Sequence, residues 1–137
     1  MGKLSGSYCL QPIGPRLFNY LPDDANPFTY ITNDGMVIQP QTMQTDGATI
    51  PWPVRGLPGF DPWDWPAGAI IHDWLYEAHH RGLTSVTFTR ANAILGEVLK
   101  DLGYPLLQRS SVVLATQLGG WVFWNRPISK DNPGEPK

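Results

Sequence analysis

The placement of proline and glycine divides this chain into two halves with different folding options. The sequence contains 14 glycines and 14 prolines, and many of them fall between Gln39 and Pro66, where no helical or strand periodicity is visible. Proline lacks a backbone donor and glycine loses much backbone entropy on ordering, so such a segment favours an ordered loop. After Pro66, apolar residues recur at helical spacing as far as Trp124. We therefore expect a loop-rich front half and a helical back half.

These two halves predict an α+β fold, with a loop-rich N-terminal half that contains a β-hairpin and packs on a three-helix C-terminal half. The hairpin signal is Asn33-Asp34-Gly35, which is flanked by β-forming residues in the segment FTYITNDGMVI. A chain of 137 residues is long enough for one hydrophobic core. Residues 1–126 are predicted to form a single globular domain, and residues 127–137 a flexible polar tail.

Start and stop signals predict three helices in the back half. The first begins at Pro66 and stops at Gly82. The second runs from about Thr87 to Gly103, and the third follows Pro105. The apolar residues expected to form the buried seam of the third helix are Leu107, Leu114, Leu118 and Trp121.

Charge and hydropathy exclude several classes of partner. The net charge is −2, and no basic run is present that would attract nucleic acid. The start MGKLSGSYCLQP lacks the apolar stretch of a secretory signal peptide. The most apolar run, Val112 to Trp124, falls short of the roughly 20 residues that a membrane-spanning helix needs. We expect no nucleic acid partner and no transmembrane segment.

All three histidines lie in the segment AGAIIHDWLYEAHH. On a helical wheel, His72, Tyr76 and His79 fall on the shoulder between an apolar stripe and a wet face. The wet face carries Asp73 and His80. A shoulder group is partly desolvated yet reaches solvent, and its pKa is easily shifted there. A structural reading stays open, in which His72 and Tyr76 only hydrogen-bond across a helix interface.

The residues His72 to Tyr76 form the pattern H-D-x-x-Y, which resembles the active-site helix of the phospholipase A2 superfamily. In that family the histidine is the general base for a water molecule and the adjacent aspartate binds calcium. The tyrosine hydrogen-bonds an aspartate on the next helix, which orients the histidine. The resemblance implies that His72 is the base and that Asp73 binds calcium with backbone carbonyls of Gly56 and Gly59. Calcium takes oxygen ligands and can polarise an ester carbonyl.

The chain departs from the phospholipase pattern on the second helix, where Asn92 occupies the position of the family's aspartate. An amide can orient an imidazole but supplies no negative charge to the imidazolium. Asp46, in the segment TDGATIP, is a second candidate because its loop leads towards the first helix. A purely structural turn, with Asp46 as a cap, is the alternative. The predicted catalytic residues are His72, Tyr76, Asp46 and Asn92.

A second resemblance spans more of the chain. The blocks TDGATIPWP, AGAIIHDWLYEAHHRG, RANAILGEVLKDLG and LGGWVFW occur in that order, and together they are similar to an uncharacterised family of small phage and prophage proteins. That family is recognised by a T-D-x-A-S/T-x-P segment followed by an H-D-W/Y-L-Y helix. The resemblance implies a phage or prophage source, and with it a location in the bacterial host cytoplasm or in the virion. It implies no established activity.

Three tryptophans, Trp52, Trp63 and Trp65, precede the histidine-bearing helix with little charge between them. They are candidate substrate-binding residues, either as an anchor at a lipid surface or as rings that stack on sugars. The alternative is that they fill a core that has little secondary structure around it. For Trp74 and Trp121 we expect a place in the core.

These observations give three hypotheses of function. The leading one is a phage-encoded, hydrolase-like protein that acts as a calcium-dependent, phospholipase A2-like esterase on phospholipid. The alternative is a non-catalytic virion or lysis-associated module that contacts other virion proteins and uses the same residues as a buried polar network. A further alternative is a cell-wall (peptidoglycan) hydrolase whose tryptophans bind glycan.

Overall fold

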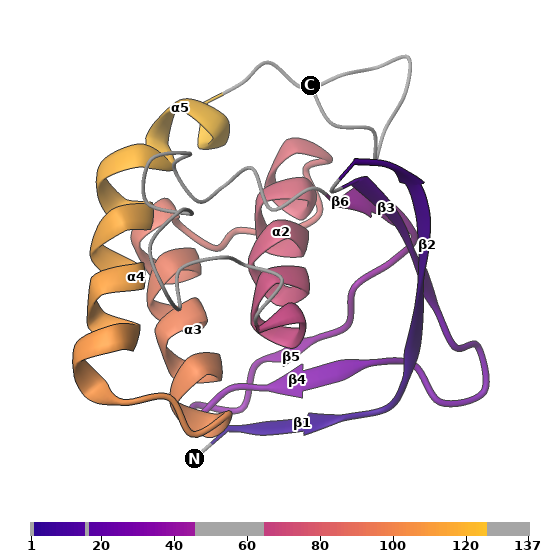
Figure 1. Ribbon diagram of the computed structural model, residues 1–137, viewed down its shortest axis with the longest axis horizontal. Helices are drawn as coiled ribbons and strands as arrows, with labels where there is room; N and C mark the ends of the chain where they lie inside the picture. Colours follow the sequence, from indigo (N-terminus) through magenta and orange to yellow (C-terminus); the bar gives the residue numbers. More distant parts are fainter. Residues whose placement is uncertain (1, 16, 46–64, 126–137) are drawn as a thin grey trace.

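The computed structural model describes residues 2–15, 17–45 and 65–125, and it has an α+β architecture, as the sequence predicts (Figure 1). The strands are β1 (Lys3–Ser5), β2 (Tyr8–Gly14), β3 (Leu17–Pro22), β4 (Thr29–Ile31), β5 (Val37–Ile38) and β6 (Met43–Thr45). The helices are α2 (Pro66–His80), α3 (Phe88–Asp101), α4 (Leu106–Gly119) and the short α5 (Trp121–Trp124).

The strands form two small antiparallel sheets, with the orders β1-β4-β5 and β2-β3-β6. The predicted hairpin is confirmed, because β4 pairs with β5 and Tyr30 lies opposite Ile38. Gly35 in its turn has a φ of +89°, a conformation that glycine adopts without steric cost. The described residues of the front half thus contain further strands besides the predicted hairpin.

The main hydrophobic core lies between the sheets and the helices α2 and α3. In Figure 1, α2 stands between the strands on one side and α3 and α4 on the other. The sheets contribute buried aromatic and aliphatic residues, among them Tyr20, Tyr30, Ile38 and Met43. The helices contribute Ile70, Ile71, Trp74, Ile94 and Val98. Because α2 is covered on both sides, most of its residues are buried, including polar ones.

The helix ends follow the predicted signals. Pro66 occupies the first turn of α2. Thr87 precedes α3, and its hydroxyl accepts a hydrogen bond from the backbone N–H of Arg90 (3.1 Å). Gly82 and Gly103 follow α2 and α3 with φ angles of +72° and +90°. A residue in this left-handed conformation turns the chain so that backbone N–H groups bond the last carbonyls of the helix.

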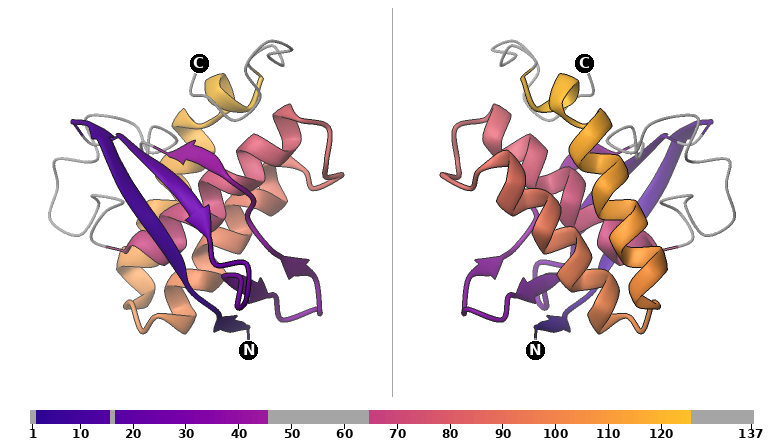
Figure 2. Two further views of the ribbon diagram at one scale, coloured as in Figure 1. Left: turned by 90° about the vertical axis from the view of Figure 1, so that its right-hand side faces the viewer. Right: turned by 90° about the vertical axis from the view of Figure 1, so that its left-hand side faces the viewer.

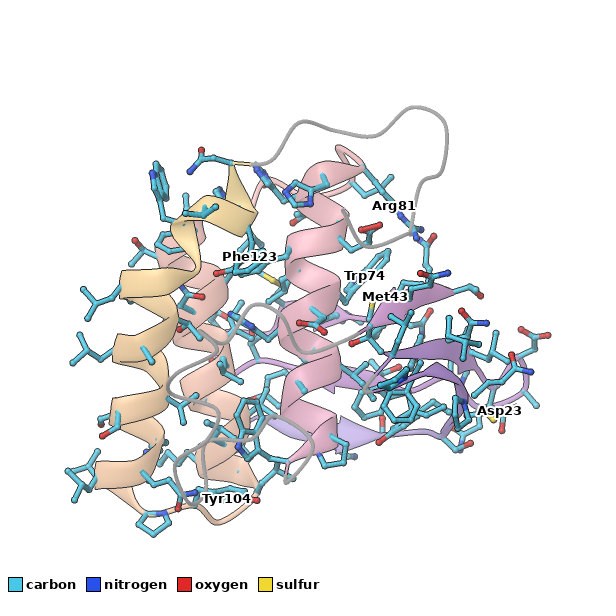
Figure 3. The ribbon with its side chains drawn as sticks, turned by 45° about the horizontal axis from the view of Figure 1, so that its top comes forward. Asp23, Met43, Trp74, Arg81, Tyr104 and Phe123 are labelled. Atoms are coloured by element: carbon cyan, nitrogen blue, oxygen red, sulfur yellow. The ribbon has the colours of Figure 1, made fainter. Side chains whose placement is uncertain are left out.

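Polar contacts fasten α2 to the strand β6. The Arg81 guanidinium donates to the carbonyl oxygen of Thr42 (2.9 Å) and lies over the Trp74 ring, 5.3 Å from its centroid. Figure 3 shows Arg81, Trp74 and Met43 close together, where α2 faces β6. Trp74 is 6% exposed, which confirms its predicted place in the core. These contacts hold the C-terminal end of α2 against the residue that precedes β6.

The predicted seam of the third helix is wrong. Leu107, Leu114 and Leu118 are 81%, 58% and 78% exposed, and Trp121 is also exposed. The buried residues of α4 are instead Val112 and Thr116. Helical spacing identifies residues that share a face, but the neighbouring element decides which face is covered. Here the covered face of α4 is the one that carries Val112 and Thr116. In the described part of the chain, no helix has the length and apolar character to cross a membrane.

Close approach of α3 and α4 depends on Gly96. A Cβ atom added at this position would stand only 2.7 Å from Cγ2 of Val113 on α4. Valine is branched at Cβ and has little rotamer freedom in a helix, so it cannot turn aside. The glycine therefore sets the distance between the two helices, and with it the contact between their polar residues.

We expect Gly96→Ala to lower the free energy of unfolding by up to about 2 kcal/mol. Overpacking costs about 1–3 kcal/mol, and the better helix propensity of alanine offsets roughly 1 kcal/mol of this cost. Val113→Ala in the Gly96→Ala background should recover much of this loss, with a coupling of about 1 kcal/mol in a urea-unfolding double-mutant cycle. Strictly additive effects would show that the two residues do not limit the approach.

Candidate functional site

A buried polar network joins α2, α3 and α4 at the predicted site. His72 and Tyr76 lie one turn apart on α2, and Asn92 faces them from the second turn of α3. The ring nitrogen Nε2 of His72 is 2.7 Å from Oδ1 of Asn92, and the Tyr76 hydroxyl donates to the same oxygen at 3.0 Å. The Asn92 amide nitrogen donates to Oε1 of Gln117 on α4 (2.8 Å). Three of the four predicted catalytic residues therefore meet.

This arrangement fixes the tautomer of His72. Oδ1 of Asn92 can only accept hydrogen bonds, so Nε2 of His72 carries a proton and donates it. In the neutral ring the other nitrogen, Nδ1, then has the lone pair that can take a proton. In the phospholipase A2 superfamily, an aspartate on the next helix orients the histidine. Here the Asn92 amide holds the His72 ring from the same position.

His72 is 1% exposed, so the prediction that it lies on a partly wet shoulder is wrong. Burial lowers its pKa from the ordinary 6.5 to about 4, and the hydrogen bond to Asn92 offsets only part of this effect. Burial also raises the pKa of Tyr76, so its hydroxyl keeps the proton that it donates. The reason for the difference is that α2 is covered by sheets on one side and helices on the other.

Asp73, the predicted calcium ligand, is half-buried next to His72. The Thr45 hydroxyl at the end of β6 donates a hydrogen bond to its carboxylate. The part of the chain that the structure describes contains no cluster of three or more histidine, cysteine or acidic residues that could hold a metal ion. Further predicted site residues lie outside the described residues: Asp46, Gly56, Gly59, Trp52 and Trp63.

Trp65, a candidate substrate-binding residue, is 2% exposed. It packs in a second core cluster with Ala69 of α2 and with residues of α3 and α4: Leu95, Leu99 and Val112. The structure therefore places Trp65 in the core, which is the alternative that the sequence left open for it, and not on an open surface.

The end of α2 carries the other two histidines, and both contact Trp124 of α5. The ring of His79 stacks on the Trp124 indole, with centroids 3.8 Å apart and planes 7° from parallel. His80 Nε2 lies 3.2 Å from the Trp124 carbonyl oxygen. His80 is only 9% exposed, so its predicted place on a wet face is wrong, because α5 folds over this end of α2.

Two polar partners were missed from the sequence, Gln117 and Thr45. Gln117 interrupts an apolar run on α4, and a lone amide in such a run is a signal for a buried partner. Thr45 directly precedes Asp46 in the chain, but its contact with Asp73 depends on how β6 crosses α2. Neither contact follows from local spacing.

Gly120, between α4 and α5, is a position where the network excludes a side chain. A Cβ atom there would overlap the Tyr76 hydroxyl and would lie 2.6 Å from the Thr116 carbonyl oxygen. The φ of Gly120 is −77°, so the backbone conformation itself suits any residue. Space, and not a turn, requires glycine here.

With the site in place, comparison with known proteins gives a family. Residues 25–116 match the family described as "Protein of unknown function (DUF1353)", more than half of the chain. The chain therefore belongs to this family. The matched span includes the hairpin and all of α2 and α3, with His72, Tyr76 and Asn92. Neither the curated proteins nor the solved structures contain a match.

The lowered pKa of His72 predicts a loss of stability in mild acid. A histidine whose pKa is about 4 when folded and 6.5 when unfolded favours folding above pH 6.5, and this contribution declines as the pH falls towards 4. Between about pH 7 and pH 5, the free energy of unfolding should drop by roughly 2 kcal/mol on this account. Urea unfolding at several pH values should show the drop in the wild type and a smaller one in His72→Gln. If the free energy of unfolding changed equally with pH in the wild type and in His72→Gln, the prediction would be contradicted.

Proposed function

We propose that this protein is a phage-encoded, hydrolase-like enzyme that cleaves carboxylic esters of phospholipids in the manner of the phospholipase A2 superfamily. The observation that carries the proposal is the shared acceptor, Oδ1 of Asn92, which takes hydrogen bonds from both His72 and Tyr76. The resemblance of H-D-x-x-Y to the phospholipase helix implies this pattern of contacts.

The chemistry follows from the tautomer. With the proton on Nε2 of His72 held by Asn92, Nδ1 accepts a proton from a water molecule as that water attacks an ester carbonyl. The tetrahedral intermediate collapses, the carbon–oxygen bond to the alcohol breaks, and the imidazolium returns the proton to the leaving alkoxide. A general base placed in this way contributes about 10²–10⁴-fold to the rate.

Calcium belongs to the proposal only through the resemblance. Among the described residues the Asp73 carboxylate is a fitting oxygen ligand, and no group of three or more histidine, cysteine or acidic side chains surrounds it. The backbone carbonyls of Gly56 and Gly59 are the proposed further ligands.

The phage or prophage source and a location in the host cytoplasm or the virion are part of the same proposal. They rest on the similarity of the four sequence blocks to small phage and prophage proteins. A phospholipid-cleaving protein from such a source would act on the host cell envelope. Hydrolysis of a glycan ordinarily uses two carboxylates that flank the bond. The described network of His72, Tyr76, Asn92 and Gln117 contains none, so it gives the alternative of a cell-wall hydrolase no support.

One observation favours a second candidate, a non-catalytic virion or lysis-associated module. His72 is buried and its pKa is about 4, so the ring is a weak base and its protonated form is disfavoured. In this reading the residues His72, Asn92, Tyr76 and Gln117 only hold three helices in register. The two candidates predict different results on adding a charge at Asn92.

We expect Asn92→Asp to raise the pKa of His72, because an opposite charge within hydrogen-bond distance stabilises the imidazolium. A rise of about 1–3 units should appear in a ring-carbon NMR titration. On the enzyme proposal, hydrolysis of a short-chain phosphatidylcholine should increase in the same variant and vanish in His72→Gln. Gln117→Ala is the matched control, since it also disturbs the network without adding charge.

The assay separates the two candidates and tests calcium. Hydrolysis should be measured with about 1 mM calcium and with chelator, alongside Asp73→Asn, because a site with so few carboxylates binds no more tightly than roughly 10⁻⁴–10⁻³ M. Loss of rate on chelation and in Asp73→Asn supports the ion. A raised pKa in Asn92→Asp with no hydrolysis by any variant supports the non-catalytic module and sinks the esterase.

A further inference from the structure

A pocket of about 500 Å³ lies at the end of the helical layer, between the α2–α3 link and α5. Figure 2 shows α5 and the C-terminal end of α2 at the same end of the helices, opposite the N-terminus of the chain. Two kinds of side chain line the pocket. They are the rings of His79, Phe88, Trp121 and Trp124, and the hydroxyl-bearing side chains of Thr84, Ser85, Thr87 and Thr89.

The rings of the lining form stacked and edge-on pairs. Phe88 and Trp121 lie edge to face, with centroids 5.1 Å apart and planes at 74°. A third ring of the lining, Trp124, stacks against the parallel ring of His79. Trp121 differs from these rings because 56% of its surface is exposed. It is an exposed aromatic ring in the pocket lining, and Phe88 packs against it.

Four residues that carry a hydroxyl group also line the pocket: Thr84, Ser85, Thr87 and Thr89. The oxygens of Thr84 and Thr87 accept hydrogen bonds from backbone N–H groups, which fixes their positions and leaves each hydroxyl proton to be donated. Ser85 and Thr89 are exposed. Among the described lining residues none is acidic, lysine or arginine, and burial lowers the pKa of His79, so at neutral pH the pocket offers a charged ligand no opposite charge.

We infer that this pocket binds an uncharged saccharide, with one sugar ring against the Trp121 indole and its hydroxyls bonded to the 84–89 segment. A sugar ring presents a face of C–H groups and an edge of hydroxyl groups. The first matches an exposed aromatic ring, and the second matches lining residues that carry hydroxyl groups. A fatty acyl chain would bury these hydroxyls without partners, and an acidic sugar would lose hydration without a counter-charge.

The pocket is distinct from the His72 network, although the two share a wall. Phe88 and Trp124 line the pocket, and both rings also contact Tyr76, with centroids 6.3 Å and 5.1 Å away. The inference does not depend on the proposed ester hydrolysis. Sugar binding is measured without turnover, so either proposal can fail while the other stands.

The test is titration of the full chain with the neutral trisaccharides chitotriose, cellotriose and maltotriose, and with the acidic trigalacturonate. We expect at least one neutral sugar to bind with a Kd of about 0.1–10 mM, and trigalacturonate to bind more weakly. In amide NMR spectra, the shifted resonances should include the Trp121 indole N–H and residues 84–89.

Trp121→Ala should weaken binding by roughly threefold to tenfold, the loss of one aromatic contact, and Trp121→Phe should lie between this variant and the wild type. Leu118→Ala is the matched control, an exposed apolar side chain of α4 that does not line the pocket, and it should bind like the wild type. Thr89→Val tests the hydroxyl-bearing residues in the same way and should also weaken binding.

Three results would overturn the inference. They are the absence of saturable binding by every neutral sugar at about 10 mM, unchanged binding in Trp121→Ala, and tighter binding of trigalacturonate. If Trp121→Ala does not fold, the indole N–H of the wild type decides, because a sugar that leaves this resonance in place is not bound at the pocket.

Discussion

The buried amide of Asn92 is the interaction on which the helical arrangement depends. It accepts hydrogen bonds from two side chains of α2 and donates one to Gln117 of α4, so a single side chain ties three helices together. A buried polar group that loses its partner costs about 1–3 kcal/mol. The helices cannot slide or rotate against one another without incurring that cost. The network therefore specifies one packing of the helices as well as one tautomer of His72.

The neutrality of this network distinguishes it from a charged catalytic pair. An aspartate at the same place would raise the pKa of His72 and stabilise its protonated form, whereas the amide holds the ring and leaves burial to lower the pKa. The hydrogen bonds thus order the side chains of the network, and none of these side chains is charged at neutral pH. Orientation without charge is compatible with a modest esterase and with a structural role, and the charge at Asn92 is the variable that separates them.

Features decided by neighbouring residues could be predicted from the sequence. The hairpin around Gly35, the start of α3 at Thr87 and the helix ends at Gly82 and Gly103 all follow from local conformational preferences. The meeting of His72, Tyr76 and Asn92 was also accessible, since one helical turn and an antiparallel neighbour bring them together. Family resemblance, more than spacing, supplied the choice of Asn92.

Burial could not be predicted in the same way, because it depends on what lies across from each face. The wheel placed His72 and His80 at or beyond the edge of the core, but sheets and α5 cover both. It placed Leu107 and Leu118 inside, but α3 packs on the neighbouring face of α4. Gln117 contacts Asn92 across the interface where Gly96 lets α3 and α4 approach closely. These are properties of contacts between distant segments.

Gly120 has a consequence for how sequences of this kind can diverge. Its place is filled by a hydroxyl from α2 and a carbonyl from its own helix, so no residue with a side chain fits while Tyr76 keeps its position. Two positions earlier, Leu118 faces solvent and is free to drift. Position 120 should therefore evolve as slowly as a core residue although it contributes no side chain. Among relatives, we expect glycine at this position wherever the tyrosine at position 76 is kept, because the tyrosine hydroxyl on α2 occupies the space of a side chain.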